Sequence, residues 1–62
     1  MDIATEIRRT ERRVKRKGLS INELCRAAQV HRATWQRWKA GDTSPTIRAW
    51  ARVTAAAKEL TG

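Results

Sequence analysis

Residues 19–41 read LSINELCRAAQVHRATWQRWKAG, and this segment predicts two short helices joined by a tight turn. The first helix has a sharp start, because Ser20 and Glu23 match the S-x-x-E pattern of a capping box. Leu19 and Leu24 flank that box at the spacing of a hydrophobic staple. A buried stripe is predicted along this helix, ending near its last residue: Ile21, Leu24, Cys25 and Ala28.

The second helix of the segment begins after a very short turn at residues 29–30, with His31 at the N-cap position. Trp35 and Trp38 are three residues apart, so they share one face and are expected to point inward. Gly41 ends the helix. The residues left on the outward face are basic, polar or small: Arg32, Ala33, Gln36 and Arg37.

A further helix is expected on the N-terminal side, over residues 3–17. Asp2 is suited to cap its start, and Gly18 suits the left-handed position that follows a helix end. The last turn carries cations, which are favourable at the negative end of the helix dipole. One face of this helix is apolar, apart from one threonine: Ile3, Ile7, Thr10 and Val14.

The C-terminal helix is expected to start with Ser44 as N-cap and Pro45 in the first helical position, and to run to about residue 60. Its apolar residues repeat at intervals of three and four: Ile47, Trp50, Val53, Ala57 and Leu60. Strand patterns are nearly absent. The predicted fold class is therefore all-α, a compact bundle of four to five short helices forming a single domain over residues 1–62.

The charge of the chain indicates a polyanionic partner. Ten arginines and four lysines stand against six acidic residues, which gives a net charge of +8 over 62 residues. Arginine is the side chain best suited to bidentate contacts with phosphate and guanine. A solvated basic surface is the alternative interpretation, but charge and helix layout together favour nucleic acid.

The same composition argues against several other classes. A chain of 62 residues has a marginal core. One histidine and one cysteine offer neither a nucleophile–base pair nor a metal cluster, so no enzyme, cofactor or small-molecule ligand is expected. Cys25 is predicted to be a buried small hydrophobe rather than a redox switch or metal ligand. The short apolar runs and the lack of a secretory signal predict a soluble cytoplasmic protein. The expected setting is a bacterial or phage-infected cell, where the protein would be associated with the nucleoid.

Residues 19–41 resemble the helix-turn-helix of the lambda-repressor/Cro-type family. The resemblance extends over about residues 5–60, because Pro45 and Ile47 continue it. It implies a lambda repressor-like bundle, sequence-specific binding to double-stranded DNA with residues 31–40 in the major groove, and a role as a small transcriptional regulator of the phage-repressor kind. The matching residues are Leu19, Ser20, Glu23, Leu24, Val30, Arg32, Thr34, Arg37, Trp38 and Gly41.

Four positions depart from the family pattern. Ile21 stands where the family usually has a glutamine that contacts the DNA backbone. Gln29 stands where glycine is usual because φ is positive, a conformation that costs other residues on the order of 1 kcal/mol. Cys25 replaces a small alanine, and Trp35 replaces a smaller aliphatic side chain. The tryptophan implies a repacked core or a tilted second helix.

Base contacts are expected from the outward face of the second helix. Arg32 and Arg37 suit guanine, and Gln36 suits adenine or a phosphate. Ala33 and the Thr34 methyl suit the methyl group of thymine. The resemblance assigns base contacts to Arg32, Ala33 and Arg37.

Backbone contacts are expected from helix N-termini at Ser20 and Ser44, from the loop at 41–44 and from Arg48. His31 either contacts DNA or only caps its helix. Of the seven cations within residues 8–17, part is expected along the DNA backbone and part in water. The full set of candidate DNA-binding residues is Ser20, His31, Arg32, Ala33, Thr34, Gln36, Arg37, Lys39, Thr43, Ser44 and Arg48.

The partner predicted first is double-stranded DNA. The family commonly binds palindromes as dimers, and a weak homodimer assisted by DNA is expected here. Residues 55–57 with Leu60 form either a dimer seam or internal contacts. The runner-up is a basic helical protein-interaction module, such as an antitoxin or anti-repressor adaptor, and RNA binding is third. The tryptophans predict a core rather than stacking platforms, and no membrane partner is expected.

Overall fold

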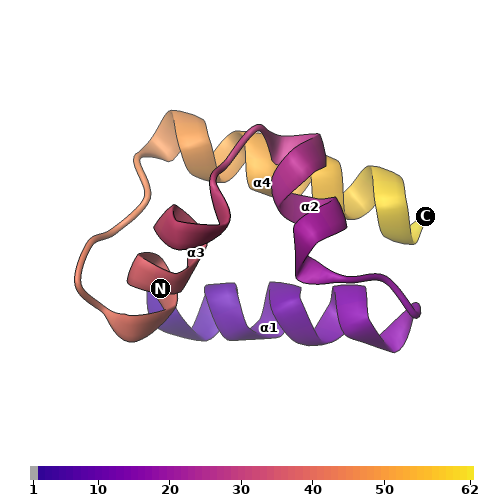
Figure 1. Cartoon of the computed structure of the whole chain (residues 1–62), viewed down its shortest axis with the longest axis horizontal. Helices are drawn as coiled ribbons and strands as arrows, with labels where there is room; N and C mark the ends of the chain where they lie inside the picture. Colours follow the sequence, from indigo (N-terminus) through magenta and orange to yellow (C-terminus); the bar gives the residue numbers. More distant parts are fainter. Residues whose placement is uncertain (1) are drawn as a thin grey trace.

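The computed structural model describes residues 2–62, which form four helices and, over that range, no strand. The helices are α1 (Ile3–Arg16), α2 (Ile21–Ala28), α3 (Arg32–Ala40) and α4 (Ile47–Thr61). In Figure 1, α1 runs along the lower edge of the view and α4 along the upper edge, with α2 and α3 in between. The all-α class is therefore confirmed, with four helices rather than five over these residues.

The ends of α1 follow from local chemistry. The Asp2 carboxylate accepts hydrogen bonds from the Ala4 N–H at 3.2 Å and from the Thr5 hydroxyl at 3.1 Å. At the other end Gly18 has φ of +80°, and its N–H donates to the Lys15 carbonyl at 2.9 Å. The predicted cap and the predicted glycine are both confirmed, and α1 ends at Arg16, one residue earlier than expected.

The start of α2 is the predicted capping box. The Glu23 N–H donates to the Ser20 hydroxyl oxygen at 3.3 Å, and the Ser20 N–H donates to the Glu23 carboxylate at 2.7 Å. At its end, Gln29 takes φ of +59°, and Val30 N–H donates to the Cys25 carbonyl at 2.8 Å. Gln29 is the one non-glycine residue with positive φ within residues 2–62, so it carries the strain that its place in the turn predicts.

Replacing this strained residue by glycine should stabilise the fold. Gln29→Gly removes a left-handed penalty on the order of 1 kcal/mol, although glycine costs more backbone entropy on folding. Gln29→Ala keeps the strain and is the matched control. We expect the glycine variant to exceed the alanine variant by about 1 kcal/mol in free energy of unfolding, measured by urea denaturation. Equal stability of the two variants would contradict a strained turn.

The core lies where the four helices meet. Its largest fully buried side chains are Trp35, Ile7, Leu24, Val14 and Val53. The Trp35 ring stacks on Trp50 with centroids 6.4 Å apart and lies tilted against Trp38 at 6.0 Å. The predicted core role is confirmed for Trp35 and Trp38, and Trp50 is half-buried against them.

Cys25 and most of the apolar segment at residues 55–60 are part of the core or pack against it. Cys25 is buried, as expected. Ala56 and Ala57 are buried in the core, Leu60 packs against it, and Ala55 is exposed. Internal contacts therefore account for most of the apolar segment that was also a candidate dimer seam.

The predicted start of α4 is wrong. The N-cap is Thr46, whose hydroxyl oxygen accepts from the Ala49 N–H at 3.0 Å, and the first helical residue is Ile47. Ser44 lies two residues before the cap, and Pro45 lies outside the helix. Ser44 and Thr46 both carry a capping hydroxyl. Both residues are compatible with the local capping rules, and the structure has the cap at Thr46.

The prediction that Ile47 belongs to the apolar face of α4 is also wrong, because its exposed fraction is 92%. Ile47 is the first residue of the helix and follows a largely exposed connection at residues 41–46. Arg48 is exposed as well, whereas Ala49 and Trp50 in the same turn are already half-buried against the core. The first fully buried residue of α4 is Val53.

Candidate nucleic-acid interface

The orientation of α3 is set by its two buried tryptophans. Trp35 and Trp38 are 1% and 6% exposed, so the opposite side of this helix must face away from the core. The residues placed on that side are all exposed: Arg32, Ala33, Gln36 and Arg37. The structure thus places on one helix face four of the five residues that were predicted to contact bases, all but Thr34.

Thr34 lies on a different side of α3. It is half-buried and lines a groove of about 270 Å³ together with Trp38 and, from α4, Ala49 and Arg52. Thr34 therefore borders a groove between α3 and α4 rather than the outward face.

The start of α3 has no side-chain cap. His31 occupies the N-cap position with φ of −69° and ψ of 143°, but its side chain makes no capping hydrogen bond. The imidazole is exposed. His31 was expected either to contact DNA or to cap α3, and its side chain does not cap the helix.

Arg32 is held by α2. Its guanidinium Nη1 donates to the Asn22 side-chain oxygen at 2.8 Å, and both residues are exposed. Asn22 was not among the predicted site residues. The two residues are ten positions apart, and only the crossing of α2 and α3 brings them together, so helical spacing carries no signal for the pair.

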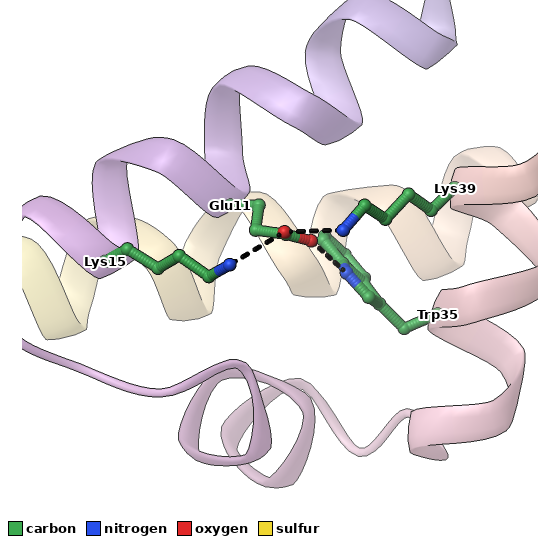
Figure 2. Close-up of polar contacts among 4 residues, drawn as sticks. All are labelled: Glu11, Lys15, Trp35 and Lys39. Carbon is green, nitrogen blue, oxygen red and sulfur yellow. Dashed lines mark hydrogen bonds and ion pairs between the residues drawn. The ribbon is translucent and has the colours of Figure 1, made fainter.

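Lys39 forms an ion pair with Glu11 of α1, so its charge is only partly available to a ligand. Its Nζ lies 2.7 Å from Glu11 Oε1, and its side chain is 38% exposed. Lys15 lies 3.2 Å from the same oxygen, and the Trp35 indole N–H donates to Glu11 Oε2 at 3.0 Å. Figure 2 shows the Glu11 carboxylate between these three side chains. The network ties α3 to α1 at a carboxylate that is almost fully buried.

The Glu11 carboxylate stays ionised far into the acid range. Burial by itself would raise the pKa of this group. The hydrogen bonds from Lys39, Trp35 and Lys15 and the charge of Lys39 outweigh that effect and lower the pKa to about 2. The charge on Glu11 is therefore present wherever DNA binding would be measured.

The predicted backbone contacts are distributed around α3. The Ser20 N–H donates to Glu23 inside the capping box and is not free for a phosphate, whereas the Ser20 hydroxyl only accepts there and keeps its O–H for donation. Thr43 and Ser44 are exposed in the connection between α3 and α4, and Arg48 is exposed in the first turn of α4. The N-terminal N–H groups expected at Ser44 begin after Thr46 instead.

Within residues 2–62, no group of three His, Cys, Asp or Glu residues is placed to hold a metal ion. The Cys25 thiol is buried, and burial raises its pKa, which disfavours the reactive thiolate. None of the four helices combines the length and apolar character needed to cross a bilayer. No family model, curated protein or solved structure matches this chain.

Proposed function

We propose that the chain binds double-stranded DNA sequence-specifically through a helix-turn-helix formed by α2 and α3, within a lambda repressor-like fold. The observation that supports this most is the orientation of α3: two buried tryptophans hold it, and its opposite face exposes Arg32, Ala33, Gln36 and Arg37. The proposed role is that of a small transcriptional regulator in the cytoplasm, without catalytic activity of its own.

The dimensions of α3 suit the major groove. The nine residues of α3 form a helix that, like any α-helix with its side chains, is about 10–12 Å in diameter. A B-DNA major groove about 12 Å wide admits one α-helix, whose N-terminal residues reach base edges. In this pose Arg32 and Arg37 donate to guanine, and Gln36 pairs with adenine or reaches a phosphate. Thr43, Ser44 and Arg48 contact the flanking phosphates.

Two copies are proposed to bind a palindromic site, with half-sites one helical turn apart. We expect the free protein to be monomeric at micromolar concentration and the second copy to bind with the help of DNA. Sedimentation with and without duplex measures both states. A tight dimer in the absence of DNA contradicts this mode of assembly.

Binding to matched nucleic acids tests the class of partner. Fluorescence anisotropy compares a random-sequence 30-base-pair DNA duplex, an RNA duplex and single-stranded DNA of the same length. We expect the DNA duplex to bind most tightly, with an affinity that falls steeply as salt rises. Preference for RNA, or no duplex binding together with tight binding to an acidic protein, would contradict the proposal.

Asn22 is expected to position Arg32 for base contact. An arginine held by one hydrogen bond keeps four further donors for a base and loses less freedom on binding. Asn22→Ala should therefore weaken binding to a selected site by about 1 kcal/mol. In a protein that already carries Arg32→Ala, adding Asn22→Ala should change the binding free energy little. Anisotropy on both single variants and the double variant measures this coupling, and additive losses would exclude it.

A further inference from the structure

Five of the six cations of α1 lie on two flanks that face different neighbours, and Arg9 lies at the border between them, because it also shares a hollow of about 280 Å³ with Arg8 and Arg12. Arg8, Arg12 and Lys15 line a groove of about 440 Å³ together with Lys39 of α3, with Glu11 as the only acid among its lining residues. Arg9 and Arg13 line a smaller hollow of about 170 Å³ on the opposite side, against Trp50 and Thr54 of α4. The larger groove will be called the α1–α3 groove.

The two flanks also differ in charge. The α1–α3 groove sets four cations against one carboxylate, a net charge of +3. Glu11 is shared by Lys15 and Lys39, whereas Arg8 and Arg12 belong to none of the ion pairs found within residues 2–62. On the α4 side, two arginines face Glu6, and Arg9 pairs with it at 3.5 Å. The net charge is therefore higher beside α3, at +3, than on the α4 side, where two arginines and one acid give +1.

The α1–α3 groove borders the outward face of α3. Lys39 lines the groove, and Gln36, three residues earlier on the same helix, lies on the outward face. Arg8 and Lys15 are seven residues apart, which gives about 10 Å of cationic edge along α1. A ligand that covers α3 therefore meets this edge.

We propose that the α1–α3 groove takes the phosphate backbone of the same duplex whose bases α3 reads, with Arg8 and Arg12 as the main contacts. The inference rests on the proposed function and assigns the backbone-facing part of α1. Exposed arginines without acidic partners are suited to bidentate phosphate contacts. A membrane surface fits this groove less well, because the apolar residues of α1, Ile7 and Val14, are buried in the core.

Paired substitutions on the two flanks test this assignment. Arg8→Gln/Arg12→Gln removes two charges from the α1–α3 groove, and Arg9→Gln/Arg13→Gln removes two charges at the same spacing from the other flank. Gln and Arg have similar helix propensities, and circular dichroism melts check that both variants fold. The measurement is the slope of log K against log salt for a random-sequence DNA duplex, by anisotropy.

Loss of two phosphate contacts lowers the size of that slope by about 1.8. We expect this drop for Arg8→Gln/Arg12→Gln and less than about 0.5 for Arg9→Gln/Arg13→Gln. Equal drops, or none for the first variant, would overturn the inference while leaving DNA binding intact. Absence of duplex binding by the wild type would overturn both proposals. A melting temperature raised by inorganic phosphate at constant ionic strength, with unchanged duplex slopes, would indicate a free-anion site instead.

Discussion

Glu11→Gln should lower the free energy of unfolding at pH 7 by about 3 kcal/mol. Glu11 is 8% exposed, and its carboxylate receives hydrogen bonds from two helices: Lys15 on its own helix, and Lys39 and Trp35 on α3. The folded protein holds its pKa at about 2, against a usual value of 4.5. Each unit of such a shift corresponds to about 1.4 kcal/mol, which gives the expected size.

The same shift fixes how the effect depends on pH. Because the pKa of Glu11 is lower in the folded state than in the unfolded one, its contribution is complete above pH 4.5. The contribution is lost as pH falls from 4.5 through 2. Glutamine resembles the protonated acid, so the difference in stability between wild type and Glu11→Gln should shrink to about 0.5 kcal/mol or less at pH 2. Urea denaturation of both proteins between pH 2 and 7 measures this.

A matched control separates the network from general charge effects. Glu59 is an exposed acid on α4, so Glu59→Gln makes the same chemical change outside the network. We expect it to alter the free energy of unfolding by no more than about 0.5 kcal/mol. If Glu11→Gln behaves like Glu59→Gln at pH 7, the buried network does not hold α3 against α1.

Arg32→Ala and Arg37→Ala should each lower the discrimination between a selected DNA site and random duplex by about 1–3 kcal/mol, roughly 5- to 150-fold. Both side chains are exposed on the face opposite the buried tryptophans. A guanidinium that pairs with guanine makes this contact at the selected site but not where another base stands. Removing it should therefore lower the affinity for the selected site more than the affinity for random sequence. Anisotropy with a selected site and a scrambled site measures both quantities.

Lys58→Ala provides the control for this prediction. Lys58 is an exposed cation in the last turn of α4, so the variant removes one charge away from α3. Its affinity for the selected and scrambled duplexes should change by the same factor. If Arg32→Ala and Arg37→Ala show the pattern of Lys58→Ala, then α3 contacts the backbone and reads no bases.

Helix positions were largely predictable because their signals are local. Asp2, the Ser20–Glu23 box and Gly18 act within a few residues of a helix end, so the sequence alone locates the boundaries of α1 and α2. The start of α4 was not predictable in the same way. Two capping hydroxyls, on Ser44 and Thr46, flank one proline, and the local rules admit either.

The outward face of α3 could be predicted from the spacing of its tryptophans, whereas the tertiary contacts could not. Glu11 and Lys39 are 28 residues apart, and Asn22 and Arg32 are ten apart. Both pairs depend on how helices cross, which helical periodicity does not encode. The exposure of Ile47 has the same origin, because a repeat pattern does not reveal where the neighbouring helices end.

Selection from a library of randomised DNA duplexes, carried out with wild type and with Arg37→Ala, tests the reading of bases by α3 most directly. The wild type should enrich a defined motif with two-fold symmetry and half-sites about one helical turn apart. Arg37→Ala should enrich the same motif with one position in each half-site relaxed. Recovery of no motif by the wild type, or of an unchanged motif by Arg37→Ala, would contradict a sequence-reading role for this helix.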